Sequence, residues 1–520
     1  MKKALNSLFL IGFFVFCGLI LALSLRGLGG NPGPKELNST IWREDGPFEL
    51  SPERGRFALL YSIAENHSFQ FSNDIGKFAI PDVAISKNKY VSLFAPFLSF
   101  ITTPGYIIGK IFGVSQVGTF AVISIFAIIN LILIRSIAIR LGANPIPSII
   151  GGLVFLFATP AFSYAVNLYQ HHVSLFLLLL SIYLLLKSNK IWSQLLVFLL
   201  CGISIPLDYP NFFMMFPIGI YALNRSISIQ KISNRFSIKI NLYKILAILV
   251  IILPIAFFLW FNYESYGNPF QLSGTLQTAK HVQDPNDLSS ILLEQKDAKD
   301  SKPDKKSAVG FFRTRNLVNG FYIHFISPDR GIVYYTPIVL FGIIGLVLAL
   351  RKKPQMVPLL IAIMGANILL YSMWGDPYGG WAFGSRYLIP SYAILSIFVA
   401  LFLTFWRKKY FLMPIFAFVA FYSIVVNTLG AITTSANPPQ VEVLDLEKIS
   451  GLIQKYTYER NWNFLMTGHS KSFVYQTFLK DYISTFGFFF ILAILICAFV
   501  TLLLILNISS KGRIEDNVSF

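Results

Sequence analysis

Long apolar runs alternate with shorter polar segments along almost the whole of this 520-residue chain. A helix that crosses a membrane needs about 20 mostly apolar residues. Runs of about this length occur at 5–25, 114–138, 145–166, 171–187, 191–207, 211–224, 244–262, 331–350, 355–374, 387–406, 410–430 and 482–507. The pattern predicts an all-α polytopic membrane protein with about 12 transmembrane helices.

The composition points to the same class. Apolar residues make up 55% of the chain and charged residues 13%, with a mean hydropathy of +0.62, which excludes an ordinary soluble domain. The first run follows Lys2 and Lys3 without a small-residue cleavage motif, so we expect a retained signal anchor at 1–25. Cys17, Cys201 and Cys497 lie inside predicted spans, where packing is a simpler role than disulfide pairing or metal binding.

The net charge of +18 is distributed unevenly between the polar segments. If 91–112 does not cross the membrane, 19 basic and two acidic residues share one face, and the other face holds 24 basic and 23 acidic residues. An excess of Lys and Arg marks the cytoplasmic side of a membrane protein. The basic residues therefore indicate orientation, and not a nucleic-acid partner. If 91–112 did cross, Lys2 and Lys3 would oppose all later basic loops, so we expect it to be an interfacial or re-entrant helix.

This orientation divides the chain into cytoplasmic connections and larger outer segments. The expected order is the anchor 1–25, a first outer loop at 26–113, helices at 114–262, an outer loop at 263–330, helices at 331–430, an outer loop at 431–481, a last helix at 482–507 and a cytoplasmic tail at 508–520. Within the second outer loop, 284–307 is charged and poor in apolar residues, which is typical of a flexible surface excursion.

A helix is predicted at 51–65 in the first outer loop. Ser51 can cap it and Pro52 suits the first helical position. Its apolar positions recur at the spacing of one helix face, and they are Phe57, Leu60, Tyr61 and Ala64. We expect the helix to lie on the membrane surface.

Glu53 in the first turn of that helix is the leading candidate for a general base. At the water–lipid boundary, partial desolvation raises the pKa of a carboxyl group towards a useful value. The alternative is an ordinary first-turn acid that complements the helix dipole. Asp82 is the second candidate; a structural ion pair with Arg54 or Arg56 is its alternative role. Lys87 and Lys89 follow, and they could bind a phosphate or extend to the membrane interface.

Polar residues also stand at the outer ends of predicted spans. The segment 167–172 (NLYQHH) contains Tyr169, His171 and His172, but adjacent histidines diverge on a helix, which favours a hydrogen-bonding patch over a metal site. Asp208 lies between two spans, where a carboxylate is costly and is a functional candidate or a helix cap.

Two later turns carry arginines. Arg330 follows Asp329, and Arg386 ends a segment rich in glycine and aromatic residues that includes Trp381. Glycines let a ligand approach the backbone, aromatic rings stack on sugar faces, and a guanidinium matches the geometry of phosphate. Interfacial anchoring is the alternative role of Arg386.

In arrangement and short motifs, these pieces resemble the GT-C membrane glycosyltransferases of the protein O-mannosyltransferase and lipid A aminoarabinose transferase branch, a family-39-like superfamily. The resemblance extends over most of the chain and includes the helix of Glu53, the stretch Asn88-Lys89-Tyr90 to Leu98, and the turns at 327–331 and 383–390. Glu53 stands where that family has an aspartate, and Arg54 stands where it has a second acid. The segment 167–172 replaces a further outer acid.

The resemblance implies transfer of a sugar from a polyprenyl-phosphate-linked donor to an acceptor on the outer face of the cell membrane. Glu53 or Asp82 would deprotonate the acceptor, with inversion at the sugar. Lys87, Lys89, Arg330 and Arg386 would hold the donor phosphate. The other candidates, placed with the substrate, are Arg54, Arg56, Tyr169, His171, His172, Asp208 and Trp381. The branch generally uses no metal or other cofactor. The acceptor, whether protein, lipid or glycan, stays open.

Three other functions are compatible with a membrane protein of this kind. A transporter or flippase for lipid-linked sugars predicts ionisable residues within the spans, and these spans are nearly free of charge. A surface-polysaccharide polymerase or ligase would use the same donors. A scaffold that presents outer loops to partners leaves the acidic helix start unexplained.

Overall fold

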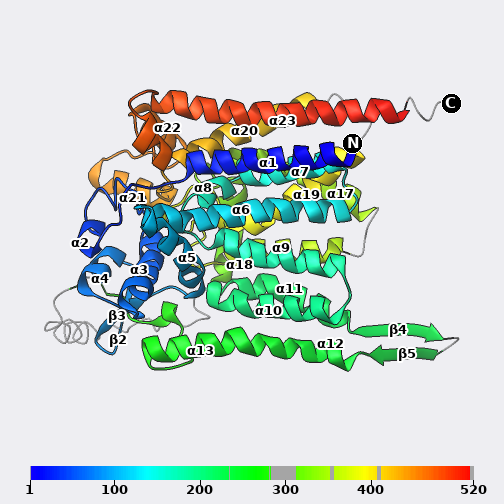
Figure 1. Cartoon of the computed structure of the whole chain (residues 1–520), viewed down its shortest axis with the longest axis horizontal. Coiled ribbons are helices and arrows are strands. Elements are labelled where there is room, and N and C mark those ends of the chain that lie inside the picture. The colour runs from blue at the N-terminus through cyan, green and yellow to red at the C-terminus, as the bar shows by residue number, and fades with distance from the viewer. Residues whose placement is uncertain are drawn as a thin grey trace.

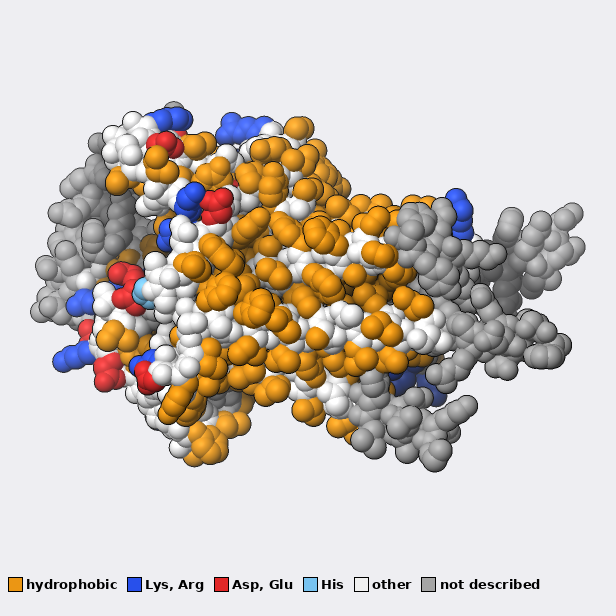
Figure 2. Space-filling view, turned by 90° about the horizontal axis from the view of Figure 1, so that it is seen from above, with side chains coloured by type: hydrophobic (Ala, Val, Ile, Leu, Met, Phe, Trp, Pro, Cys, Tyr) orange, Lys and Arg blue, Asp and Glu red, His pale blue; other side chains and the backbone are white. Residues whose placement is uncertain are grey.

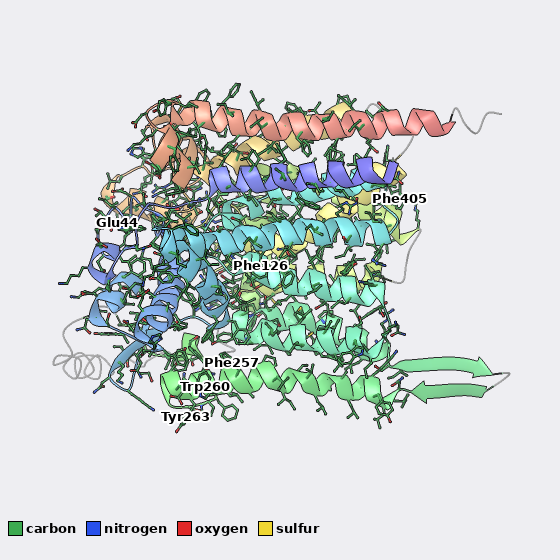
Figure 3. All side chains as sticks on the ribbon, in the orientation of Figure 1. Glu44, Phe126, Phe257, Trp260, Tyr263 and Phe405 are labelled. Carbon is green, nitrogen blue, oxygen red and sulfur yellow. The ribbon has the colours of Figure 1, made fainter. Side chains whose placement is uncertain are left out.

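Long helices run side by side along the molecule, and the shorter elements gather at one end (Figure 1). The computed structural model describes residues 2–232, 235–279, 282, 312–351, 356–406 and 412–515; the charged excursion expected at 284–307 lies outside them. Figure 3 shows Glu44 at the end with the shorter elements, which we call the loop end, and Phe405 at the opposite end.

Helices occupy each of the predicted apolar runs. They are α1 (Lys2–Ser24), α6 (Ser115–Arg140), α7 (Pro145–Phe157), α9 (His171–Lys187), α10 (Ile191–Leu207), α11 (Asn211–Asn224), α12 (Leu242–Leu246) with α13 (Ile252–Tyr266), α17 (Leu340–Leu350), α18 (Val357–Ser372), α19 (Ile389–Phe405), α20 (Leu412–Ile432) and α23 (Thr485–Glu515). Within the described residues, five helical segments are both long and apolar enough to cross a membrane, and six shorter apolar helices accompany them.

The outer surface of this bundle is suited to lipid. Figure 2 shows apolar side chains over the middle of one face and the acidic side chains at the loop end. On α13, Trp260 and Tyr263 are 47% and 57% exposed near the same end (Figure 3). Aromatic residues of this kind are enriched where a membrane meets water.

Helix α19 is the buried centre of the bundle, because every residue from Ile389 to Thr404 is buried. Two neighbouring helices reach its backbone through glycine. A Cβ on Gly342 of α17 would lie 2.4 Å from the carbonyl oxygen of Leu395, and one on Gly151 of α7 would lie 2.6 Å from that of Ser396. Small residues allow such close packing of membrane helices. The start of α19 is therefore held firmly.

The two ends of the segment 26–113 lie beside each other, because the backbone N–H of Gly30 donates a hydrogen bond to the carbonyl of Gly113 at 2.8 Å. Within this stretch, α5 (Phe97–Ile111) packs on α6 through facing glycines. A Cβ on Gly118 would lie 2.3 Å from the carbonyl oxygen of Gly105. With 15 residues, α5 is shorter than the about 20 that a crossing helix needs.

Helix α3 (Ser51–Asn66) forms where expected, but its surroundings differ from the expectation. Leu50, and not Ser51, occupies the N-cap position. The helix is not the exposed amphipathic helix that we expected, because protein buries it from Glu53 to Leu60, including Leu59 outside the expected apolar face. Carbonyl groups of neighbouring loops accept hydrogen bonds from its arginines, so the polar side of the helix is covered by protein.

The chain is mostly helical but not all-α, which corrects the predicted fold class. Strands β1 (Gln70–Phe71), β2 (Val83–Ser86) and β3 (Lys89–Ser92) form an antiparallel sheet in the order β1-β3-β2, and β4 (Ile227–Ile232) pairs with β5 (Arg235–Ile240). Lys87 and Asn88 have φ angles of 48° and 59°, as in the two-residue turns that fit the twist of a hairpin.

Several short helices complete the structure. They are α2 (Pro34–Leu37), α4 (Asn73–Ala79), α8 (Ala161–Ala165), α15 (Leu317–Phe325), α16 (Ile332–Tyr335), α21 (Gln440–Ser450) and α22 (Glu459–Met466). Figure 1 shows α2, α4, α21 and α22 at the loop end, together with α3 and the three-stranded sheet.

Candidate active site

A polar cavity of about 200 Å³ lies at the loop end, between α3 and the ends of α9, α11, α18 and α19. Five candidates from the sequence line it: Arg56, Tyr169, His171, Asp208 and Arg386. The rest of its wall consists of Pro52, Phe94, Gln170, Pro210, Tyr371, Trp374 and Tyr387. Segments far apart in the sequence thus meet around one small polar space.

A second, mostly apolar cavity of about 420 Å³ adjoins the first. The two share Phe94, Asp208, Pro210 and Trp374. The remaining lining residues of the apolar cavity are Leu93, Ala95, Tyr209, Phe213, Leu272, Gly274, Thr275 and Phe312. The combined space is polar at one side and apolar at the other, which suits a ligand with a charged head and a hydrocarbon tail.

Two arginines face the polar cavity from opposite elements. The guanidinium of Arg386, at the start of α19, lies 5.1 Å from the centre of the Tyr169 ring, and that of Arg56, on α3, lies 5.5 Å from it. Arg386 donates to the carbonyl of Gly379, but its Nε and Nη1 have no hydrogen-bond partner among the described residues. Burial lowers the pKa of Arg56. Donors of this kind are ready for an anion.

Asp208 is the carboxyl group on the wall of both cavities. Its Oδ2 accepts a hydrogen bond from Gln170 at 3.0 Å. Burial raises the pKa of Asp208, although the Gln170 hydrogen bond and Arg56 oppose this effect. The His171 ring is stacked on Tyr169 with 5.7 Å between ring centres, and its Nε2 has no partner within the described chain. These groups can hold hydroxyl groups beside an anion.

Glu53 is fully buried in the first turn of α3, and not at the water–lipid boundary that we expected. Its Oε2 accepts a hydrogen bond from the N–H of Leu50 at 3.4 Å, while Oε1 has no partner in the described structure. Burial and the nearby charge of Glu49 raise the pKa of Glu53 to about 8. An orphaned buried carboxyl oxygen is costly in a purely structural role, so it marks a functional candidate.

Asp82 follows the cis peptide bond between Ile80 and Pro81 and is partly exposed. Burial raises its pKa, opposed by a hydrogen bond from Ser51 and by the charge of Arg56. The expected ion pair with Arg54 or Arg56 is absent from the described residues, because both guanidinium groups bind backbone carbonyls.

A buried ion cluster, which the sequence did not indicate, fixes the segment before α3. Glu49 forms an ion pair with Arg26 at 2.8 Å and lies 3.8 Å from the Nζ of Lys471. Its two oxygens also accept hydrogen bonds from Thr434 at 2.7 Å and from the N–H of Ser435 at 2.6 Å. Burial raises the pKa of Glu49, but its cationic partners outweigh this effect, and the net shift is downward.

Four candidates of the sequence lie outside the polar cavity. His172 binds the carbonyl of Ala161 at 2.8 Å, and Arg54 donates to three backbone carbonyls. Arg330 is fully buried, and its guanidinium donates to the carbonyls of Asp329, Tyr378, Gly380 and Asn437. Trp381 lines a different cavity. None of these four lines the polar cavity.

The two lysines predicted to hold a phosphate lie on the surface. Lys87 forms part of the β2–β3 turn and Lys89 begins β3, and both are exposed outside the polar cavity. Sequence reasoning assumed that residues close in the chain to Asp82 share its site. The hairpin instead directs them to the outside.

Several residues of the cavity gave no separate signal in the sequence. Gln170 lies within the polar segment 167–172, and Tyr387 directly follows Arg386, so proximity to a motif could have found them. Phe94 packs on Arg56, with 4.4 Å between the guanidinium and the ring centre, and Gly55 leaves room for it on α3. Only the folded structure reveals that contact.

No family model matches this chain, and no curated protein matches it. Among solved structures, ArnT from Cupriavidus metallidurans aligns with 96% of this chain, and the alignment spans 78% of the ArnT chain at 14% identity. The TM-score is 0.43 for ArnT in the apo state and 0.44 for ArnT bound to undecaprenyl phosphate. A second match is the archaeal oligosaccharyltransferase AglB from Archaeoglobus fulgidus, in complex with an inhibitory peptide and a dolichol-phosphate. It aligns with 95% of this chain, and the alignment spans 56% of the AglB chain at 12% identity, with a TM-score of 0.39.

Proposed function

We propose that this protein is a membrane glycosyltransferase that moves a sugar from a polyprenyl-phosphate-linked donor to an acceptor hydroxyl on the outer face of the membrane. The observation that carries the proposal is the pair of adjoining cavities. The polar cavity has the guanidinium groups of Arg56 and Arg386 at its wall and shares four lining residues with an apolar cavity at the end of a lipid-facing bundle. This combination matches a phosphorylated sugar joined to a hydrocarbon chain.

Arg386 and Arg56 have the role of binding the donor phosphate. As the bond between the anomeric carbon and the phosphate oxygen breaks, its electron pair stays on the lipid phosphate, and negative charge grows there. Guanidinium groups that are already fixed against Tyr169 stabilise this charge without reorganisation. Lys87 and Lys89 have no role in the proposed site because they are exposed on the surface, and Arg330 has none because its guanidinium is bound by four backbone carbonyls. Glu53 and Asp82 do not line the two cavities either, and their role depends on movement of the acceptor or of the first turn of α3.

Glu53 is the base in the proposed reaction. It takes the proton of the acceptor hydroxyl while the hydroxyl oxygen attacks the anomeric carbon from the side opposite the phosphate, which inverts that carbon. A pKa of about 8 makes the ionised Glu53 a stronger base than an ordinary glutamate, and the carboxylate that accepts the proton becomes the major form above about pH 8. Asp82 is the alternative base, and Asp208 binds a hydroxyl group of the donor sugar.

A carrier for lipid-linked sugars has less support. Carriers bind their substrates near the middle of the membrane so that the site can open to both faces. The cavities described above are lined by the ends of helices and by loops of one end. A polysaccharide polymerase or ligase would use the same chemistry with a glycan acceptor, and it differs from the proposal only in the acceptor.

The test follows lipid-linked sugars in membranes. Cells that lack the protein should accumulate a polyprenyl-phosphate-linked sugar, and membranes containing the protein should consume that extracted lipid. Glu53→Gln should lower the rate by about 10²–10⁴-fold, the usual contribution of a general base, while the protein still accumulates. Full activity of both Glu53→Gln and Asp82→Asn would contradict the mechanism. Absence of any accumulated lipid-linked sugar would contradict the function.

A further inference from the structure

A third cavity, of about 650 Å³, lies at the loop end and is separate from the two described above. Its wall comes from the first loop, from the segment before α19, and from residues 453–467 around α22. The volume falls within the range of about 300–1,000 Å³ that is typical of small-molecule sites. We call it the Trp381 cavity.

Trp381 gives this cavity a fixed aromatic face. Its indole Nε1 donates to Oε2 of Glu442 at 2.7 Å, and the guanidinium of Arg460 lies 5.5 Å from its ring centre. The side chain is nevertheless 37% exposed, and Phe464 lines the same space. Glu442 fixes the indole N–H and Arg460 covers one face of the ring, so the other face can stack on a ligand.

The four charged residues on the wall of the Trp381 cavity are two acids and two bases, Glu44, Glu49, Lys455 and Arg460, so their formal charges cancel. Glu49 is paired with Arg26 and Lys471, Lys455 forms an ion pair with Glu459 at 2.7 Å, and Arg460 lies over Trp381. The side-chain amides of Gln454 and Asn463 line the space and have no hydrogen-bond partner among the described residues. A neutral ligand with many hydroxyl groups fits this wall better than a strongly ionic one.

The Trp381 cavity and the polar cavity are lined by neighbouring parts of the first loop. Glu49 on the wall of the Trp381 cavity and Arg56 on the wall of the polar cavity stand either side of Glu53 in the chain, so the two sites border the same segment. A single loop also joins the two sites, because Trp381 and Arg386 lie in the segment that Arg330 holds through the carbonyls of Tyr378 and Gly380.

We propose that the Trp381 cavity binds a neutral saccharide, with a sugar ring stacked on Trp381 and its hydroxyls hydrogen-bonded to Gln454 and Asn463. The role of this saccharide as the acceptor rests on the proposed glycosyltransferase function; the binding itself does not. Its hydroxyl would approach Glu53 from the side of Glu49, while the donor sugar approaches from the side of Tyr169. The acceptor would then be a glycan or glycolipid, and not a peptide.

The test measures saccharide binding without any transfer reaction. The full chain is placed in lipid nanodiscs free of sugar-based detergent, and saturation-transfer NMR is recorded with maltose, lactose and mannobiose, and with an uncharged Ser/Thr peptide of similar mass. At least one disaccharide should receive saturation and show saturable binding. Trp381→Ala and Asn463→Ala should each weaken this binding by about tenfold or more.

Trp462→Phe is the matched control, because Trp462 precedes Asn463 on α22 but packs on Phe486 and Phe489 outside the cavity. It should leave binding unchanged. If Trp381→Ala does not fold, the Asn463→Ala result decides. Binding of none of the three disaccharides, binding that neither variant weakens, or binding of the peptide in their place would overturn the proposal. Saccharide binding in a protein that transfers no sugar would refute only the glycosyltransferase function.

Discussion

Glu53 is fully buried and Asp208 is partly exposed, and the partners of the two carboxyl groups also differ. Glu53 has one oxygen without a partner in the described chain and lies beside Glu49, whereas Asp208 is hydrogen-bonded to Gln170 and faces two arginines. The first arrangement makes the ionised carboxylate of Glu53 more basic, and the second favours a carboxyl group of Asp208 that stays in place and binds hydroxyl groups.

The raised pKa of Glu53 predicts a pH dependence of stability. With a folded-state value of about 8, above the ordinary value of 4.5, the folded protein holds this proton more tightly than the unfolded chain. Stability should therefore fall as the pH rises from about 4.5 through 8. Glu53→Gln removes the titration, so its melting temperature relative to the natural protein should rise between pH 6 and pH 9 by at least about 3 °C. A difference that stays constant with pH would contradict the assignment.

Asp208→Asn should reduce sugar transfer differently from Glu53→Gln. It removes a charged acceptor for a sugar hydroxyl, and such hydrogen bonds contribute about 1.5–3 kcal/mol. We expect kcat/KM for the donor to fall by about 10- to 100-fold, with part of the loss in KM. Asp445→Asn, at an exposed position on α21, is the control and should have no effect. An unchanged KM and kcat in Asp208→Asn would exclude Asp208 from the site.

Single residues were predicted best where a local signal accompanied them. Glu53 stands at a helix start, and Arg386 follows a segment of glycines and aromatic residues, so both could be selected from the sequence. The Glu49 cluster could not, because its partners Ser435 and Lys471 are brought to it only by folding, Ser435 from 386 positions away. No local pattern records such a contact.

At the scale of elements, glycine contacts decide how closely the helices pack. Gly118 of α6 and Gly105 of α5 bring two backbones together without side chains between them, as small residues do in membrane bundles. This contact holds α5 beside the beginning of α6. Because Ser99 of α5 donates to the carbonyl of Arg56 at 2.9 Å, it also supports the position of α3.

Gly118→Val should separate α5 from α6. Its Cβ would lie 2.3 Å from the carbonyl oxygen of Gly105, so the two backbones must move apart. We expect a loss of about 1–3 kcal/mol of stability, seen as a lower melting temperature in fluorescence-detected size-exclusion chromatography. Gly12→Val is the control in α1, because nothing lies within 4 Å of its Cβ position. Equal melting temperatures for the two variants would refute the packing argument.

The elements show where hydrophobic periodicity succeeds and where it fails. Long apolar runs predicted the helices of the bundle, because a helix surrounded by lipid and a helix surrounded by protein both consist mainly of apolar residues. The periodicity of α3 predicted a surface helix, yet both of its arginines are buried: Arg54 donates to carbonyls of other loops, and Arg56 donates to the carbonyl of Pro52 in the same helix. The strands β2 and β3 were missed, since both are short and their turn contains no glycine.

At the scale of the whole molecule, function depends on which end faces outward. The beginning of α1 and the end of α23 lie at the end opposite the cavities (Figure 1). The excess of basic residues in the connecting segments predicts that this opposite end is cytoplasmic. The cavities would then open on the outer side, where lipid-linked donors are used after they cross the membrane.

Cysteine labelling tests this orientation. In a background without Cys17, Cys201 and Cys497, a cysteine at position 113 should react with a membrane-impermeant maleimide from outside intact cells. A cysteine at position 189, in the connection between α9 and α10, should react only after the cells are permeabilised. The opposite pattern would place the cavities on the cytoplasmic side and contradict the proposed topology.

The central claim is that the two adjoining cavities bind a polyprenyl phosphate, with Arg56 and Arg386 on its phosphate. Native mass spectrometry of the purified full chain can compare undecaprenyl phosphate with undecaprenol in the natural protein, Arg56→Gln, Arg386→Gln and the exposed control Arg315→Gln. We predict that the natural protein binds undecaprenyl phosphate but not undecaprenol. Arg56→Gln and Arg386→Gln should each weaken phosphate binding by tenfold or more, and Arg315→Gln should not change it. Equal binding of phosphate and alcohol, or unchanged phosphate binding in both cavity variants, would contradict the claim.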